Sequence, residues 1–144
     1  MNLERVKKEF FKDISDNNIT KVEGFYLNHK YEAWEFLDSE SFDGLQRAIY
    51  YNYTTLAHII IQSIKKRLND LEFVKYINKK GKLGLTSILE AAYRGNIDII
   101  EDLLEHGADI EMTSVNGLSV LHIACQSDQI NLVVYLVEKL KMGI

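Results

Sequence analysis

The sequence contains no proline, a single cysteine and no long apolar run. Without proline, its helices must end at glycine, asparagine or aspartate residues, which punctuate helices in other ways. The lone thiol, Cys125, excludes a disulfide within the chain and indicates a reducing compartment. The longest aliphatic stretch, Ile59–Ile61, is far shorter than the roughly 20 residues that a membrane-spanning helix needs.

The amino terminus and the net charge bear on where the protein resides and on what it binds. Residues 1–5 lack the apolar segment of a secretory signal peptide, so we expect a cytoplasmic protein. The formal net charge of −4 gives no overall basic field, and we expect no nucleic-acid partner. Basic residues do gather between Lys65 and Lys82. We interpret them as a solvated helix face, with attraction to an anionic membrane surface as the alternative.

Two segments of the chain repeat each other at a distance of 33 residues. Residues 84–92 align with residues 117–125, and the agreement continues through the apolar positions that follow. A fixed period of this length is typical of stacked-repeat proteins, in which each unit buries an apolar face against the next. The matching apolar positions are Ile97, Ile99, Ile100, Leu103 and Leu104 in one copy and Ile130, Leu132, Val133, Leu136 and Val137 in the other.

Each of these copies carries the residues that a helix–turn–helix unit needs. Thr86 and Ser119 can accept hydrogen bonds from the free N–H groups at the start of a first helix. Ala91 and Ala124 are small enough to let a neighbouring helix approach closely. Gly107 permits the left-handed conformation that ends a second helix, and the segment after it is expected to form an extended hairpin finger.

Two weaker copies precede these. In the second, Asp43 takes the capping position, 43 residues before Thr86 and therefore ten residues beyond the period. The extra residues fall within 65–80, where we expect an extended second helix or an added short helix. The first copy is the most degenerate and has no recognisable capping residue. Its apolar residues Phe10, Ile19, Val22, Phe25 and Tyr26 fall at the positions of Ile88, Ile97, Ile100, Leu103 and Leu104.

The pattern predicts four helix pairs. The pairs are expected at 3–15 with 19–29, 43–51 with 55–68, 86–94 with 97–106, and 119–127 with 130–140. We expect one domain over residues 1–144. Its repeats are placed near 1–35, 36–80 with an insertion near 65–80, 81–113, and 114–144, the last incomplete.

The period and the segment from Ser119 to Ala124 resemble the ankyrin-repeat family. The resemblance is specific over residues 80–140 and loose over residues 1–45. It implies an all-α ankyrin-repeat solenoid of about four helix–turn–helix repeats with β-hairpin fingers. It also implies a protein-binding module that needs no cofactor. The sequence departs from the family pattern at Asp128, where most repeats carry glycine, and keeps the family histidine only as His122.

A narrower resemblance concerns residues 48–52, 76–80 and 120–129. These segments look like the ankyrin portion of DHHC-type protein palmitoyltransferases from protists. The resemblance implies a cytosolic N-terminal segment that recruits protein substrates, at the cytosolic face of a membrane that a missing downstream region would reach. The Asp-His-His-Cys signature itself is absent from the chain. The alternative is an ankyrin adaptor, free-standing or within a longer array, with no link to an enzyme.

His122 and Cys125 are the residues that could suggest chemistry. They lie three apart on one predicted helix and could share a metal, but no further cysteine or paired histidine supplies the remaining ligands. We therefore expect no metal site and no catalytic residue in this chain. Because Cys125 occupies a small-residue position of its repeat, we expect it to be a buried side chain.

The alignment also nominates residues for partner binding. First helices and fingers line the concave face that such solenoids use for a protein or peptide partner. Tyr50 and Tyr93 occupy equivalent positions and are expected to stack along this groove, and tyrosine and arginine dominate interface energetics. The residues expected to be exposed there are Arg47, Tyr50, Tyr51, Glu90, Tyr93, Arg94, Ile123 and Gln126, with Ser127 beside them.

The last predicted helix is apolar outside its core stripe. Val134 and Tyr135 replace Glu101 and Asp102 of the preceding repeat. We expect self-association through this C-terminal repeat, because an exposed apolar patch is a contact site. The residues expected to form that patch are Leu132, Tyr135, Leu136 and Leu140.

Overall fold

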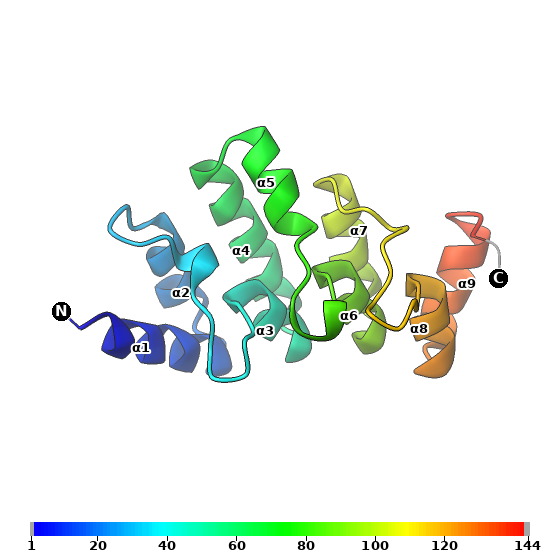
Figure 1. Cartoon of the computed structure of the whole chain (residues 1–144), viewed down its shortest axis with the longest axis horizontal. Helices are drawn as coiled ribbons and strands as arrows, with labels where there is room; N and C mark the ends of the chain where they lie inside the picture. The colour runs from blue at the N-terminus through cyan, green and yellow to red at the C-terminus, as the bar shows by residue number, and fades with distance from the viewer. Residues whose placement is uncertain (1, 143–144) are drawn as a thin grey trace. The chain divides into compact units, whose positions relative to one another are not determined.

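The computed structural model of the protein describes residues 2–142, whose helices pair as the sequence predicts (Figure 1). The pairs begin and end within two residues of the expected bounds. They are α1 (Leu3–Ser15) with α2 (Ile19–Leu27), α3 (Gly44–Tyr50) with α4 (Thr54–Arg67), α6 (Ser87–Arg94) with α7 (Ile97–Glu105), and α8 (Val120–Gln126) with α9 (Ile130–Glu138). Two short 3-10 turns, η1 (Ala33–Glu35) and η2 (Lys82–Gly84), precede α3 and α6.

The chain divides into two compact units, Met1–Phe73 and Val74–Ile144. The division falls inside α5 (Asp70–Ile77), a separate short helix. This helix accounts for the ten extra residues, so the added helix is correct and the extended second helix is not. The first unit contains the first two helix pairs, and the second unit contains the last two.

Side-chain caps start the first helix of every pair. The hydroxyls of Thr86 and Ser119 accept from backbone N–H groups three residues on, and the Asp43 carboxylate accepts from the N–H of Gln46 at 2.8 Å. These three caps are confirmed. The prediction that the first copy has lost its cap is wrong, because the Asn2 side chain accepts from the N–H of Glu4 at 2.9 Å.

The turn inside each pair is the same in all four copies. One residue there has a left-handed backbone, and the next residue donates its N–H to a carbonyl five residues back. Only Gly95 is a glycine. Asparagine and aspartate tolerate this conformation better than other side chains do, so the turn survives at Asp128 without glycine. The four left-handed residues are Asn17, Asn52, Gly95 and Asp128.

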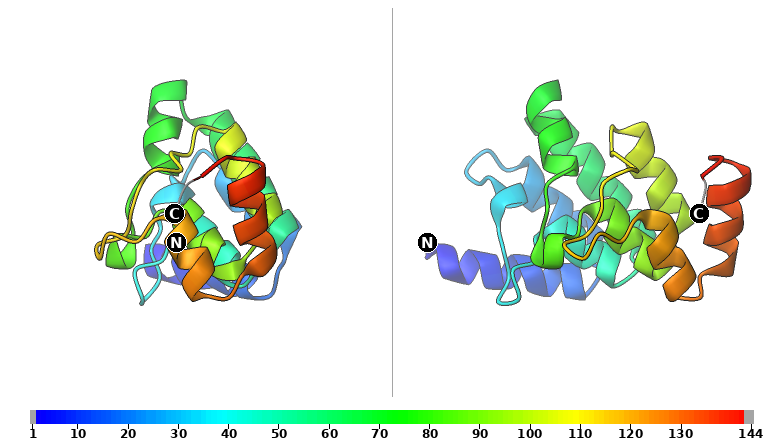
Figure 2. Two further views of the ribbon diagram at one scale, coloured as in Figure 1. Left: turned by 90° about the vertical axis from the view of Figure 1, so that its right-hand side faces the viewer. Right: turned by 45° about the vertical axis from the view of Figure 1, so that its right-hand side comes forward.

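The fingers are tight turns, and the described residues contain no β-strand. Each finger is closed by a backbone hydrogen bond, from Asp38 to Phe42, from Gly81 to Leu85 and from Ser114 to Leu118. One such bond replaces the ladder of the expected β-hairpin. In the second unit the two fingers lie side by side, where the N–H of Val115 donates to the carbonyl of Leu83 at 3.2 Å (Figure 2).

An aromatic cluster forms the core of the first unit. The ring of Phe10 packs edge-on against Phe25, Tyr26 and Phe36, with centroids 5.3 to 5.4 Å apart. Gly44 begins α3 directly against this cluster, where a Cβ would overlap the Tyr26 hydroxyl oxygen. The close approach of α3 to α1 therefore depends on the missing side chain.

Arg67, at the end of α4, holds the segment that follows α2. Its guanidinium donates to the carbonyls of Tyr26, Asn28 and Tyr31 at 2.7 to 3.3 Å and stacks 4.9 Å from the ring centroid of Trp34. Arg67 therefore serves packing within the first unit and does not belong to a freely solvated basic face.

Small residues bring the helices of the second unit together. Ala91, Ala92 and Ala124 are fully buried where α6 meets α7 and α8. Leu103 and Leu136 are fully buried at equivalent positions of α7 and α9. Ala91 and Ala124 therefore have the spacing role that the repeat alignment assigns to them.

Candidate protein-binding surface

The structure corrects the expected exposure of three nominated residues. Arg47, Glu90 and Ile123 are buried, although the sequence predicts them on the surface. They are three occurrences of one repeat position, so the error is systematic. Arg47 and Glu90 each have a partner of opposite charge nearby, which offsets part of the free-energy cost of burying a charged side chain.

Tyr50 and Tyr51 do reach the surface, with 40% and 38% of each residue exposed. Their rings belong to a row of four aromatic side chains in the first unit. Successive ring centroids from Phe42 through Tyr50 and Tyr51 to Tyr53 lie 5.4 to 5.7 Å apart. We call these four residues the aromatic ladder.

The ladder is anchored from both ends. Behind it, the guanidinium of Arg47 lies 4.1 Å from the ring centroid of Phe42 and 5.2 Å from that of Tyr50. Arg47 is fixed in turn by Asp38 of the finger, whose carboxylate accepts from two of its nitrogens at 2.6 and 2.8 Å. At the far end, the Tyr53 hydroxyl donates to the carbonyl of Ser15 at 2.9 Å. The exposed rings therefore stand on a rigid base.

In the second unit, Glu90, Tyr93 and Arg94 line a hollow of about 240 Å³ beside the fingers. The guanidinium of Arg94 lies 4.0 Å from the buried carboxylate of Glu90, one helical turn away on α6. The Tyr93 carbonyl accepts from the side-chain amide of Gln129 at 2.9 Å, which ties α6 to the start of α9. The opposite wall consists of the finger residues Leu83, Leu85, Ser114, Asn116 and Leu118.

The fourth repeat presents a different surface from the one expected. Gln126 is exposed as predicted, but Ile123 lies in the core. Cys125 is exposed, which contradicts its expected burial. The equivalent Ala92 is buried where α6 meets α8, whereas within residues 2–142 no further first helix packs on α8. His122 makes a local contact at the start of α8, since its Nδ1 accepts from the Ser119 N–H and lies 3.0 Å from the Ser119 hydroxyl.

Sequence reasoning missed the finger residues of both units. Phe42, Leu85 and Leu118 each stand immediately before a capping residue, so the same alignment places them together. Phe42 ends the aromatic ladder, and the two leucines line the hollow beside α6. Tyr50 and Tyr93 lie in different units, and their stacking stays a prediction.

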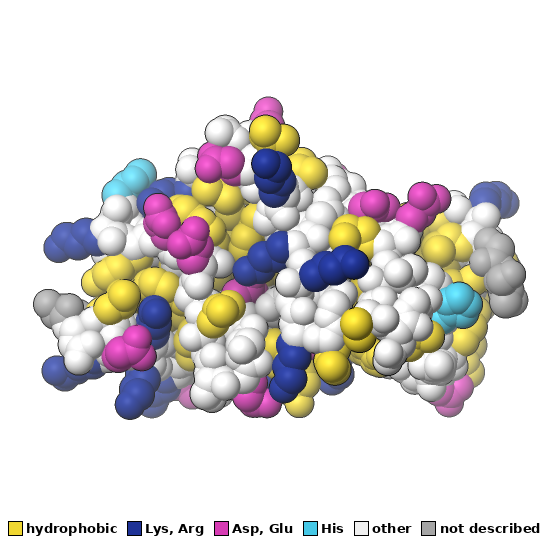
Figure 3. All heavy atoms as spheres, viewed as in Figure 1, with side chains coloured by type: hydrophobic (Ala, Val, Ile, Leu, Met, Phe, Trp, Pro, Cys, Tyr) yellow, Lys and Arg dark blue, Asp and Glu magenta, His cyan; other side chains and the backbone are white. Residues whose placement is uncertain are grey.

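We searched the described residues for a metal site and for a membrane-spanning helix. Among residues 2–142, no three histidine, cysteine or carboxylate side chains come together in a way that could hold a metal ion. No helix in the same range is long and apolar enough to cross a membrane. Side chains of both charge signs are scattered among apolar ones over the face seen in Figure 3.

Relatives of known identity share parts of this sequence. The human Notch-regulated ankyrin repeat-containing protein is 32% identical over 81 residues, which are 56% of this chain and 69% of that protein. The palmitoyltransferase AKR1 of Lachancea kluyveri is 37% identical over 75 residues, 46% of this chain but 10% of the enzyme. The second match agrees with the resemblance to palmitoyltransferase ankyrin segments.

The fold also has a solved counterpart. The crystal structure of the yeast ribosomal protein Rps3 in complex with its chaperone Yar1 contains a chain that superposes on this one with a TM-score of 0.86. The match covers 100% of this chain and 98% of the other at 16% identity, which shows the fold alone. A family model described as ankyrin repeats in three copies matches residues 45–144. With the repeated caps, turns and fingers described above, this match establishes that the chain belongs to the ankyrin-repeat family.

Proposed function

We propose that this chain binds a protein or peptide through its first helices and fingers, the elements expected on the concave face of the repeats. Ankyrin repeats are a protein-interaction module without catalytic activity of their own, which supports this general role. The observation that carries the specific site is the aromatic ladder. Tyr50 and Tyr51 expose large rings that are already immobilised, so binding orders few new side-chain rotations.

The hollow beside α6, which belongs to the second unit, is a second candidate surface. It combines an aromatic ring from Tyr93, a guanidinium from Arg94 and apolar finger residues. Tyrosine and arginine are the side chains whose truncation most often weakens interfaces. A peptide that places an apolar side chain against the Tyr93 ring and a carboxylate near Arg94 fits this hollow.

The test begins with peptides selected from a random library on the purified domain. Binding of a selected peptide is then measured by fluorescence anisotropy for the native chain and for Tyr50→Ala, Tyr93→Ala and the double variant. Each truncation is expected to weaken binding by about 1–4 kcal/mol, the range of interface hot spots. Circular dichroism should show that each variant stays folded, because Tyr50 is 40% exposed and Tyr93 is half-buried.

Leu71→Ala is the matched control, because Leu71 is an exposed apolar residue on α5 outside both surfaces. It should leave peptide affinity unchanged. Selected peptides that bind Tyr50→Ala and Tyr93→Ala as tightly as the native chain would place the binding site elsewhere.

The wider setting is a second part of the proposal. We propose that this chain is the substrate-recruiting N-terminal segment of a DHHC-type palmitoyltransferase, because part of it is similar to AKR1. A free-standing adaptor is the alternative, favoured by the larger share of the Notch-regulated ankyrin protein that the chain matches. The complete transcript that encodes residues 1–144 decides between them. Membrane spans followed by Asp-His-His-Cys support the enzyme, and a stop codon or further repeats support the adaptor.

Self-association through the last repeat is proposed on different residues from those first expected. Leu132 and Leu136 are buried in their own repeat, so the patch predicted from the sequence is wrong in detail. The exposed apolar residues of α9 are Ile130, Val134 and Val137, with 65%, 46% and 39% exposed. Sedimentation velocity should show a dimer that Val134→Asp with Val137→Asp dissociates. A native chain that stays monomeric at millimolar concentration argues against it.

A further inference from the structure

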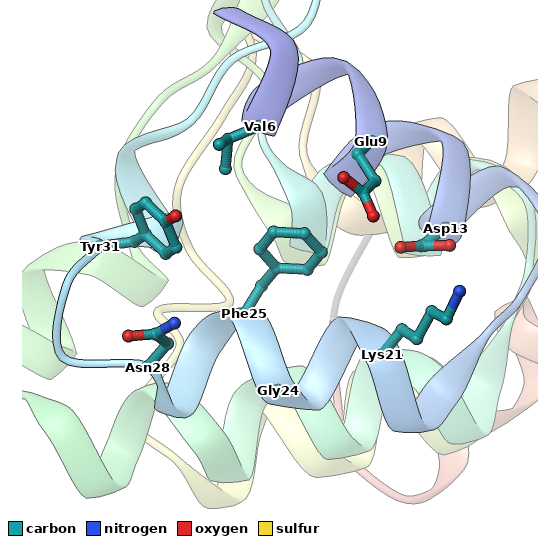
Figure 4. Close-up of a pocket in the computed structure, with 8 residues that line it drawn as sticks. All are labelled: Val6, Glu9, Asp13, Lys21, Gly24, Phe25, Asn28 and Tyr31. Atoms are coloured by element: carbon teal, nitrogen blue, oxygen red, sulfur yellow. The ribbon is translucent and has the colours of Figure 1, made fainter. Parts of the chain in front are cut away.

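A second hollow, of about 390 Å³, opens between α1 and α2 on the first helix pair (Figure 4). Glu9 and Asp13 line it from α1, and Lys21 and Phe25 line it from α2. Tyr31, in the segment after α2, closes one end. This hollow shares no residue with the aromatic ladder or with the hollow beside α6.

Asp13 is anomalous at its position in the repeat. The carbonyl of each residue at this position accepts the N–H that closes the turn, and in the other three copies the residue is a buried alanine. Asp13 is only 7% exposed, and its Oδ2 has no hydrogen-bond partner among the described residues. A buried carboxylate oxygen without a partner costs free energy. Its presence indicates a role that alanine cannot perform. The equivalent alanines are Ala48, Ala91 and Ala124.

Gly24 keeps the hollow open. It lies in the middle of α2, where glycine is less favourable than alanine by about 1 kcal/mol. A Cβ built on Gly24 would meet no atom within 4 Å, so neither crowding nor a left-handed backbone requires glycine there. Gly24 is exposed and lines the hollow, so a side chain at this position would enter open space at its wall.

The remaining walls suit a flat cation. The rings of Phe25 and Tyr31 stand 6.3 Å apart between centroids at 43° to each other. Aromatic faces attract guanidinium groups, and paired carboxylates accept their N–H donors. Arg67 donates to the carbonyl of Tyr31, which fixes the backbone position of that residue at the end of the hollow.

We propose that the hollow between α1 and α2 binds an arginine side chain of a partner peptide. The guanidinium lies against the ring of Phe25, on the side away from Tyr31, and donates to the carboxylates of Glu9 and Asp13. The site is separate from the surfaces of the proposed function and does not depend on them. Here the occupant is fixed by charge and shape, since the hollow joins two carboxylates to two aromatic faces.

A polar outer face that keeps a terminal repeat soluble is the simpler explanation. It accounts for exposed residues such as Glu9 and Lys21. It does not account for Asp13, which is buried, nor for Gly24, where any polar side chain would serve solubility better. Lys21 directs its ammonium group toward Asp13 in Figure 4. It is therefore an internal competitor of the guest, and its removal should strengthen binding.

The probe is the peptide acetyl-Gly-Arg-Gly-amide, titrated into ¹⁵N-labelled protein and followed by NMR. The amides of Gly24 and Phe25 should shift and saturate. The isosteric citrulline peptide, which lacks the charge, should bind at least about tenfold more weakly, as expected for a lost charge-assisted hydrogen bond. The lysine peptide should also bind more weakly, since an ammonium group lacks the planar fork.

Three variants and one control complete the test. Asp13→Asn should weaken the arginine peptide about tenfold, Gly24→Leu should abolish binding by filling the hollow, and Lys21→Gln should strengthen it severalfold. Thr20→Leu is the matched control, because Thr20 is exposed on α2 and does not line the hollow. Equal binding of arginine and citrulline peptides, or an unchanged affinity in Gly24→Leu, overturns the proposal. Equal binding of arginine and lysine peptides overturns the preference for a planar cation.

Discussion

Substituting Gly44 by alanine should destabilise the protein, mainly because the added Cβ overlaps the Tyr26 hydroxyl. The added Cβ would overlap the hydroxyl oxygen of Tyr26 and lie 2.8 Å from Cζ of Phe10 and 3.0 Å from Cδ1 of Ile14. These three side chains are fully buried in the aromatic core of the first unit, so none can swing into solvent. Overpacking of this kind costs about 1–3 kcal/mol, against a gain of about 0.4–1 kcal/mol from the reduced entropy of the unfolded chain. A net loss of about 1–2 kcal/mol is expected.

Tyr26→Phe should relieve most of that loss. It removes the oxygen that the new Cβ meets first, and that oxygen has no hydrogen-bond partner among the described residues. By itself Tyr26→Phe should be neutral or stabilising by about 1 kcal/mol, since it removes a buried polar atom that is not satisfied. In the Tyr26→Phe background, Gly44→Ala should therefore cost about 1 kcal/mol less than in the native chain.

Urea denaturation of the native chain, both single variants and the double variant gives the coupling energy directly. Fluorescence of Trp34, the only tryptophan, reports on the unit that carries both positions. A Gly44→Ala cost that is identical in the two backgrounds would refute the reasoning, because the overlap with Tyr26 would then not be its source. A stabilised Gly44→Ala variant would show that α3 can move away from the core without cost.

Further outcomes follow from the same contacts. Burial raises the pKa of Tyr26 well above 10, and the charge of Asp43 adds to the effect. The unfolded chain therefore loses this proton first, so the free energy of unfolding should be unaffected below about pH 10 and should fall above it by up to about 1.4 kcal/mol per pH unit. Urea titrations at pH 8 to 11 should show that Tyr26→Phe removes this loss. Arg67→Met should lower the free energy of unfolding by about 2 kcal/mol, because three carbonyls lose their hydrogen-bond donor. It should also shift the fluorescence emission of Trp34 to the red, because the indole loses the cation stacked on it. Unchanged emission would contradict the packing of Arg67 on Trp34. If residues 1–144 form one domain, transitions followed by Trp34 fluorescence and by circular dichroism should coincide, and two separate midpoints would instead make the two units independent. The exposed thiol of Cys125 should react with Ellman's reagent in the native state within about tenfold of its rate in urea, whereas protection by several orders of magnitude would mean that it is buried.

The sequence by itself determined the features that depend on local chemistry. Helix bounds, the caps at Asp43, Thr86 and Ser119, and the repeat length all follow from residue types at fixed spacing. A capping side chain reaches only three residues along the chain, so nothing distant is needed to place it. The same locality explains why the left-handed turn at Asp128 keeps its form without glycine.

Exposure was decided by what packs against each helix, and periodicity does not contain that information. Arg47 and Glu90 look like surface residues because they are charged, yet each is buried with an opposite charge beside it. Cys125 looks like a core residue because its equivalent Ala92 is one. Ala92 is buried where α8 packs on α6, whereas the described part of the chain places no such neighbour on α8.

The hollow between α1 and α2 shows the same limit most clearly. The alignment places Asp13 at a small-residue position. The first repeat departs from the pattern at many positions, so this mismatch alone does not indicate a function. Only the packed structure shows that its carboxylate is buried without a partner, beside a glycine that leaves open space. Burial, free volume and hydrogen-bond satisfaction are properties of atoms brought together from separate helices, which is why the tertiary structure alone reveals them.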